Sequence, residues 1–462
     1  MTLTAPVRAR LEGNLRRFIL FRLFYSARFY YPVLTVLFLD YGLSLEQFGL
    51  LNLVWALSIV VAEVPSGAMA DVFGRKRLVV FAAVLMVIEM ALLVLVPIGA
   101  SPVLFTVFLL NRICSGFSEA AASGADEALA YDSLKALGRE KEWAPLLEKT
   151  SRVVAVGFFS TMIIGAFVYD SALLNGALGY LRESWQLSED SIIRLPIVLT
   201  LLSAVVVLFT TLGMYDIDRD DLAQARVSVG SNWSVVRDAF AQIYVAARWT
   251  AGHQFVLFVI LAALALDSVA RQFVVLASEY YRLIDIPVSW FGVIGAAMSL
   301  LGIVSARLAR VMVDRLSPAQ NFLGLAAILL ISLWGLTLAL PYWGVGFAMG
   351  CFLILGMVQF QTSFYLNREV DSKIRATVLS FRGLALNLGL GFASLFYTAW
   401  IGVLKRAQDT VMTAEQLEER VFMEALHGFP FYFIFLGLAV LLLARLLYGR
   451  RDVFFVRPRA GG

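Results

Sequence analysis

The stretch GAMADVFGRKR, residues 67–77, decides how the rest of the chain is interpreted. An acid, Asp71, ends a long apolar segment and is followed by a basic cluster, so alternative ion pairs can form at a helix end. Gly67 permits the close approach of a second helix, and Gly74 permits a tight turn. Such a cluster can hold a gate, and the residues expected to form it are Gly67, Asp71, Gly74, Arg75, Lys76 and Arg77.

Composition places this stretch in a membrane protein. The chain of 462 residues is 60% hydrophobic, whereas soluble domains are roughly 45–50% apolar. Its apolar runs are long and do not alternate with polar residues, so they predict helices rather than barrel strands. The run at residues 18–39 is too long for a signal peptide and no small-residue cleavage site follows it, so we interpret it as a retained first span.

Windows of about 20 apolar residues predict an all-α membrane protein with twelve transmembrane helices. The first six are expected at residues 18–40, 47–70, 77–98, 102–130, 146–170 and 196–214. The other six are expected at residues 253–279, 288–312, 319–340, 343–366, 376–403 and 429–448. A degenerate copy of the first stretch, RVMVDRLS at residues 310–317, adds Asp314 and Arg315 to the gate. The repetition predicts two pseudo-symmetric six-helix bundles.

Charge asymmetry predicts how the chain is threaded. Basic residues gather in alternate connections between spans, and these connections should face the cytoplasm. We therefore expect a protein of the inner cell membrane with both termini in the cytoplasm. We expect a cytoplasmic segment at residues 1–17, bundles at 18–214 and 253–448, a cytoplasmic linker with an amphipathic helix at 215–252, and a cytoplasmic tail at 449–462. Within the outer segment 405–427, Thr413 and Gln416 form a capping-box pattern that predicts a short helix.

The fourth span carries charges that a lipid-facing helix would not tolerate. Arg112, Gly116, Glu119, Ser123 and Asp126 recur at helical spacing and should share one face. An arginine in mid-membrane costs about 2.5–3.5 kcal/mol, so a water-filled cavity or an acidic partner is expected. One alternative is that Arg112 and Glu119 form a permanent structural pair.

Residues 67–77 match the signature G-x-x-x-D-x-x-G-R-R/K, and in this the chain resembles the major facilitator superfamily of secondary transporters. Arg112 and Gly116 fit a second motif of that family, whereas Val72 departs from the first motif and residues 157–166 lack the Gly-Pro of its antiporters. The resemblance implies alternating access to a cavity lined by spans one, four, seven and ten. The implied proton-coupling candidates are Arg112, Glu119, Glu89 and Asp267, and the implied substrate-cavity candidates are Arg28, Arg112, Asp267, Arg271 and Gln359.

The leading functional hypothesis is proton-coupled efflux of a small organic solute by a monomer embedded in membrane lipid. Two alternatives stay open. Several cavity arginines would suit an anionic solute moved by symport or uniport, and a non-transporting receptor or lipid-handling protein can share the fold. No phosphate-binding loop, catalytic triad or zinc-protease motif occurs, so no enzyme activity and no cofactor are expected. The basic residues form no single patch that predicts a nucleic-acid partner.

Overall fold

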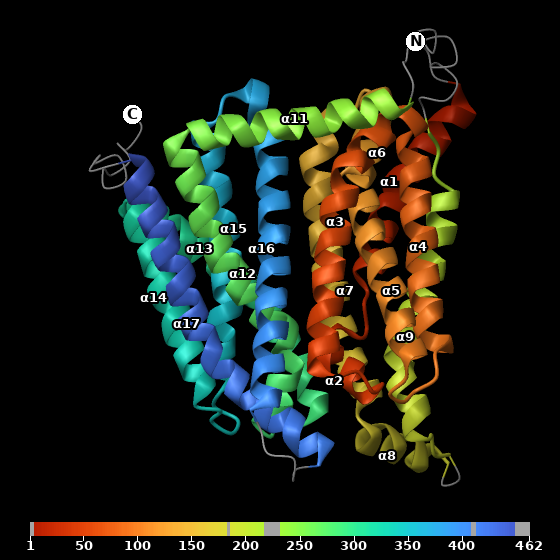
Figure 1. Ribbon diagram of the computed structural model, residues 1–462. Coiled ribbons are helices and arrows are strands. Elements are labelled where there is room, and N and C mark those ends of the chain that lie inside the picture. The colour runs from red at the N-terminus through yellow and green to blue at the C-terminus, as the bar shows by residue number, and fades with distance from the viewer. Residues whose placement is uncertain (1–3, 183–184, 217–231, 408–412, 449–462) are drawn as a thin grey trace.

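The computed structural model describes residues 4–182, 185–216, 232–407 and 413–448. Long helices stand side by side in two bundles (Figure 1). The beginning of α1 and the end of α17 lie at the same end of the molecule, which we name the termini end, and the opposite end, with α2 and α8, is named the far end. Eleven of the described helices are long and apolar enough to cross a membrane.

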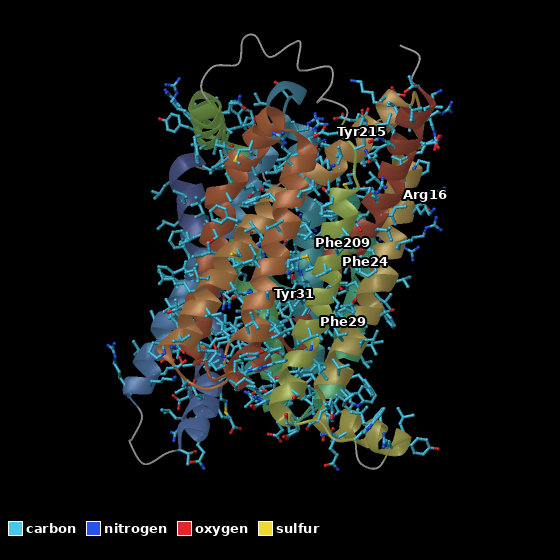
Figure 2. The ribbon with its side chains drawn as sticks, turned by 90° about the vertical axis from the view of Figure 1, so that its right-hand side faces the viewer. Arg16, Phe24, Phe29, Tyr31, Phe209 and Tyr215 are labelled. Atoms are coloured by element: carbon cyan, nitrogen blue, oxygen red, sulfur yellow. The ribbon has the colours of Figure 1, made fainter. Side chains whose placement is uncertain are left out.

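The N-terminal bundle is built around the predicted spans one to six. Its elements are α1 (Ala5–Ser26), η1 (Tyr31–Val33), α2 (Leu34–Asp40), α3 (Leu45–Phe73), α4 (Arg75–Leu95), α5 (Pro102–Ala122), α6 (Ala125–Ala136), η2 (Glu140–Glu142), α7 (Trp143–Tyr169), α8 (Ser171–Leu181) and α9 (Glu189–Leu212). In Figure 2, Arg16 and Tyr215 lie toward the termini end, whereas Phe24, Phe209 and Phe29 lie along the middle of the bundle.

The C-terminal bundle contains six long helices. These are α12 (Gln254–Leu283), α13 (Val288–Arg315), α14 (Pro318–Thr337), α15 (Val345–Glu369), α16 (Ser372–Arg406) and α17 (Ala414–Tyr448). The two bundles meet where α3 packs on α16 and where α7 packs on α13, and α2 also contacts α12. These contacts between spans far apart in the sequence enclose the space in which the candidate site lies.

The first span is broken, although residues 18–40 were predicted to form one helix. Helix α1 ends at Ser26, and α2 begins only at Leu34. Pro32 explains part of this difference, because it lacks an N–H and disfavours helical backbone at the preceding residue. The amide freed at Phe29 donates to Thr200 Oγ1 over 3.0 Å, so the break remains hydrogen-bonded.

The linker helix α11 (Asn232–Gly252) lies across the termini end and contacts both α3 and α16 (Figure 1). The sequence places an amphipathic helix in this region. The side chains of Trp233 and Val236, on its expected apolar face, lie outside the described residues, as do residues 217–231. Of the expected cytoplasmic segment 1–17, the structure describes residues 4–17. The expected cytoplasmic tail, residues 449–462, lies outside the described residues.

The last helix is longer than predicted. Thr413 and Gln416 do form the capping box, with N–H to side-chain distances of 3.2 and 3.3 Å. The helix that they start is not a short outer helix, because α17 continues from Ala414 through Pro430 to Tyr448. A proline inside a membrane helix is tolerated where neighbouring groups satisfy the freed carbonyl, so the predicted short helix and the twelfth span form one element.

Candidate functional site

Polar contacts between the bundles lie at the far end. The guanidinium of Arg282 on α12 donates to Asp40 at the end of α2 over 2.9 Å, and the hydroxyl of Tyr169 donates to the same carboxylate over 2.6 Å. Lys405 on α16 donates to Glu46 on α3 over 2.6 Å. The contacts of Arg282 and Lys405 join the two bundles, whereas Tyr169 holds Asp40 from within its own bundle, so the far end is closed in this conformation.

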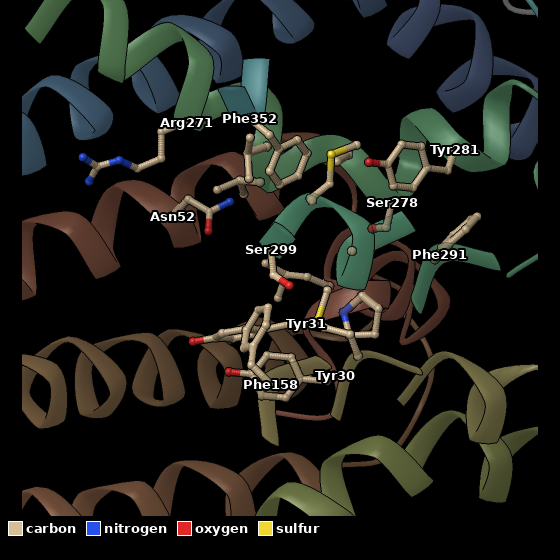
Figure 3. Close-up of a pocket in the computed structure, with 18 of the residues that line it drawn as sticks. Tyr30, Tyr31, Asn52, Phe158, Arg271, Ser278, Tyr281, Phe291, Ser299 and Phe352 are labelled. Atoms are coloured by element: carbon tan, nitrogen blue, oxygen red, sulfur yellow. The ribbon is translucent and has the colours of Figure 1, made fainter. Parts of the chain in front are cut away.

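A central cavity of about 410 Å³ lies between the bundles. This volume falls within the range of sites for small organic molecules. Helices α3, α5 and α7 of one bundle and α12 and α13 of the other contribute most of its wall. Ten of the lining residues are labelled in Figure 3, namely Tyr30, Tyr31, Asn52, Phe158, Arg271, Ser278, Tyr281, Phe291, Ser299 and Phe352.

Arg112 reaches this cavity from α5 at a point where α5 packs tightly on α3. A Cβ at Gly116 would lie 2.5 Å from the Cβ of Ser58 and 2.9 Å from the carbonyl of Trp55, so only glycine permits this approach. The Nε of Arg112 donates to the Asn111 side chain over 3.2 Å, and its guanidinium lies 4.7 Å from the Phe38 ring centroid. These contacts hold the arginine but leave its Nη2 without a hydrogen-bond partner.

The other two candidate arginines are paired. Arg28 forms a buried ion pair with Glu89, and Arg28 is not among the residues that line the central cavity. Arg271 lines the cavity, but it pairs with Asp267 and donates to Asn387 over 3.0 Å. In Figure 3 its guanidinium points away from the other labelled side chains. Two proton-coupling candidates, Glu89 and Asp267, therefore already have a cation beside them.

Glu119 differs from these acids. It lies two turns beyond Arg112 on α5, and its side chain is exposed. It makes no ion pair within the described part of the chain. The permanent pair of Arg112 with Glu119, which the sequence left open, is not formed. Glu119 lines the central cavity and also a second cavity of about 510 Å³ between α1, α5, α6 and α7.

The second cavity lies where the fourth span is interrupted. Helix α5 ends at Ala122, and Gly124 has φ 76°, a backbone conformation that favours glycine. Asp126 therefore lies in the first turn of a separate helix, α6, rather than on the face of Glu119. Asp126 still lines the second cavity, where Arg22 donates to it over 3.2 Å.

The stretch at residues 67–77 forms the expected turn. Gly74 has φ 92° between the end of α3 and the start of α4. Arg75 pairs with Asp132 on α6 and donates to the carbonyl of Ala128 over 3.1 Å. Asp132 was missed by the sequence reasoning, because nothing but its acidity distinguishes it there. The side chain of Asp71 lies outside the described residues.

The remaining candidates lie apart from the cavities. Lys76 is partly buried and Arg77 is exposed. In the degenerate copy, Asp314 and Arg315 are exposed, and Asp314 lies 4.0 Å from Arg310 of its own helix. Gln359 is exposed and is not among the lining residues of the central cavity, because its position on α15 turns it away from that space.

Comparisons with known proteins identify the fold. The sequence model of the Major Facilitator Superfamily matches residues 18–394. Comparison with curated protein sequences gives no match. The crystal structure of the nucleoside transporter NupG superposes with a TM-score of 0.68 at 12% identity, covering 96% of this chain and 100% of that one.

Two further structures share this architecture. A bacterial homologue of the human lysosomal transporter Spinster, inward-facing and unoccupied, gives a TM-score of 0.64 at 15% identity over 96% of this chain and 98% of that one. A D-xylose-proton symporter gives 0.59 at 13% identity over 98% and 99%. At such identities the structures show the fold only, while the sequence match shows the family and indicates a transporter rather than an enzyme. The chain belongs to the major facilitator superfamily of membrane transporters.

Proposed function

We propose that the chain is a proton-coupled secondary transporter that moves a small organic solute by alternating access. The central cavity between two bundles supports this proposal, because rocking of the bundles would open it to each end in turn. The termini end would face the cytoplasm and the protein would act as a monomer in the inner membrane, surrounded by lipid. In this orientation the closed far end is the outer face.

The observation that carries the proposal is the position of Glu119. In the described residues it has no ion pair, and it lines both the central and the second cavity. Closing the bundles around a carboxylate removes water from it, which is costly for the charged form and much less costly for the protonated form. Protonation of Glu119 would therefore favour states with a closed cavity, and deprotonation would favour states in which water reaches it.

We propose export as the direction, since Gly74, Arg75 and Arg112 match motifs that occur together in many exporters. A second candidate is symport of an anionic solute with a proton. The unpartnered Nη2 of Arg112 favours this candidate, because a guanidinium without an acid beside it is suited to a carboxylate or phosphate. The sign of proton movement separates the two, since solute and proton move in opposite directions in antiport and together in symport.

The test is proton movement in proteoliposomes that contain the purified protein and a pH-sensitive dye. Organic cations, anions and neutral amphiphiles are added outside, and wild type is compared with Glu119→Gln. We expect a solute-dependent pH change in wild type that Glu119→Gln loses, while solute exchange between the two sides persists.

The matched control is Glu127→Gln, which removes an acid from the second cavity that already pairs with Arg22. It should retain the pH change. A pH change that survives in Glu119→Gln would move the proton to Glu89 or Asp267. No solute-dependent response for any of the compounds would favour the non-transporting alternative.

A further inference from the structure

On the side of the central cavity formed by the N-terminal bundle, two hydrogen-bond donors have no partner among the described residues. They are Nη2 of Arg112 and Nδ2 of Asn52, and both atoms are buried. Arg112 is 5% exposed and Asn52 is 3% exposed. Buried donors that lack an acceptor are rare in folded proteins because they lose their bonds to water without replacement. Two of them beside one cavity leave room for an acceptor that a ligand supplies.

The register of α3 and α5 places these donors at the same depth. The two helices run in the same direction and touch where Gly116 meets Trp55 and Ser58. Arg112 precedes Gly116 by four residues and Asn52 precedes Trp55 by three, which is about one turn in both helices. Figure 3 shows Asn52 facing the cavity from α3. The register therefore places both residues at one depth of the cavity wall.

Within the part of the chain that the structure describes, no acid forms an ion pair with Arg112. Asp267 is occupied by Arg271, and Glu89 is occupied by Arg28. Glu119 lies seven residues further along α5, about 10 Å away along the helix axis. Arg112 does lie beside Tyr30, but a neutral hydroxyl leaves the positive charge in place. The acceptor that fits this subsite is consequently an anion.

The rest of the wall is suited to a flat apolar group. Tyr31, Trp55, Phe158, Phe291 and Phe352 line the same cavity and come from both bundles. Aromatic side chains bind planar apolar bodies by stacking and edge-to-face packing. In the second bundle, the hydroxyl of Tyr281 on α12 is also buried without a partner among the described residues, and it belongs to the lining of the same cavity.

We propose that the central cavity binds an organic anion with a planar apolar body, whose acidic group accepts hydrogen bonds from Arg112 Nη2 and Asn52 Nδ2. The ligand is a substrate only if the proposed transport function holds, but its binding can be measured without transport. A ligand held by donors from one bundle and by Tyr281 from the other would be gripped only when the bundles enclose it. The substrate class then follows from the cavity wall.

The test uses three probes of nearly equal shape and different charge. They are naphthalene-2-carboxylate, its neutral carboxamide and the cationic naphthalene-2-carboxamidine, and their affinities for the detergent-purified protein are measured by calorimetry. We expect the carboxylate to bind about tenfold more tightly than the amide, since bonds to a charged group are stronger than neutral ones. The amidine should bind most weakly, because it places a cation beside Arg112.

Variants assign the preference to the two donors. Arg112→Gln should abolish the preference for the carboxylate, whereas Arg112→Lys should keep part of it. Asn52→Ala keeps the charge and should weaken carboxylate binding severalfold. The matched control is Arg152→Gln, an equal loss of charge on α7 at an exposed pair with Glu148, and it should bind as wild type does. Gel filtration shows that each variant is folded.

Equal affinity for the three probes, or tighter binding of the amidine, would overturn the inference. So would a carboxylate preference that persists in Arg112→Gln. The result is separable from the transport proposal. Carboxylate binding without any transport would contradict only the proposed function, and transport of cations without carboxylate binding would contradict only the anion site.

Discussion

Removal of the charge at Lys405 is expected to loosen the closed far end. Lys405 on α16 contacts Glu46 on α3 over 2.6 Å, which joins the two bundles, and it also contacts Glu418 on α17 of its own bundle. In Lys405→Gln the pair between the bundles is lost. The two glutamates that remain then face each other across the interface and repel.

The size of the effect follows from the exposure of these groups. The side chains of Lys405 and Glu46 are 19% and 25% exposed, so solvent screens part of their attraction. An ion pair in such surroundings contributes about 0.2–1 kcal/mol, and repulsion between the remaining carboxylates adds a similar amount. A total of about 0.4–2 kcal/mol would shift the population of the closed far end by a factor of roughly 2–30.

Spin-label distances across the far end measure this population. The chain contains only two cysteines, Cys114 and Cys351, and both can be replaced by alanine to give a background without reactive thiols. Labels are then attached at Tyr180→Cys on α8 and at Trp343→Cys between α14 and α15, where the native side chains are 94% and 82% exposed. Double electron-electron resonance reports the distance between the two bundles. We expect a single distance in the parent protein and an added longer one in Lys405→Gln.

The control is Arg420→Gln, which removes a cation from an exposed pair within α17 and should leave the distances unchanged. Raising the salt concentration should shift the parent toward the longer distance, because salt screens partly exposed charges. An unchanged distance distribution in Lys405→Gln would refute the reasoning. The far end would then be held by packing and by the Asp40 cluster, with no measurable share from Lys405.

Three further outcomes are expected. Glu89→Gln should destabilise the detergent-purified protein by about 3–5 kcal/mol, because it leaves Arg28 buried without its partner; a thermal melting curve equal to that of wild type would contradict this. Gly292→Ala should shift the far end toward the open state in the same spin-label assay, because the added Cβ would lie 2.3 Å from a backbone carbonyl of α7, whereas Gly302→Ala meets no atom within 4 Å and should have no effect. Asp71→Asn should impair transport about tenfold or more while leaving the amount of folded protein in the membrane unchanged, if the gate needs its charge; normal transport would end the gating hypothesis.

Local patterns in the sequence were sufficient for the architecture. Hydropathy runs predict membrane helices because each span must satisfy its own backbone hydrogen bonds in lipid. The Gly74 turn was predictable because a positive φ is a local requirement that glycine meets. The errors are also local. Pro32 accounts for part of the break in the first span, where the apolar run predicted one helix. Helix α17 includes a polar segment that was predicted to form a separate helix.

The sequence by itself determined the family, the twelve-span plan and the polar residues that must avoid lipid. It could not determine which of these residues are paired, because pairing depends on distances between helices that are far apart in the chain. Arg28 meets Glu89 across 61 residues, which no local pattern predicts. The pair of Arg271 with Asp267 is the exception, because the two lie one turn apart on the same helix. Only the tertiary structure leaves Arg112 and Asn52 with unpartnered donors at one depth of one cavity. The close packing of α3 on α5 at Gly116 brings Arg112 and Asn52 to the same depth, and no local sequence pattern predicts this.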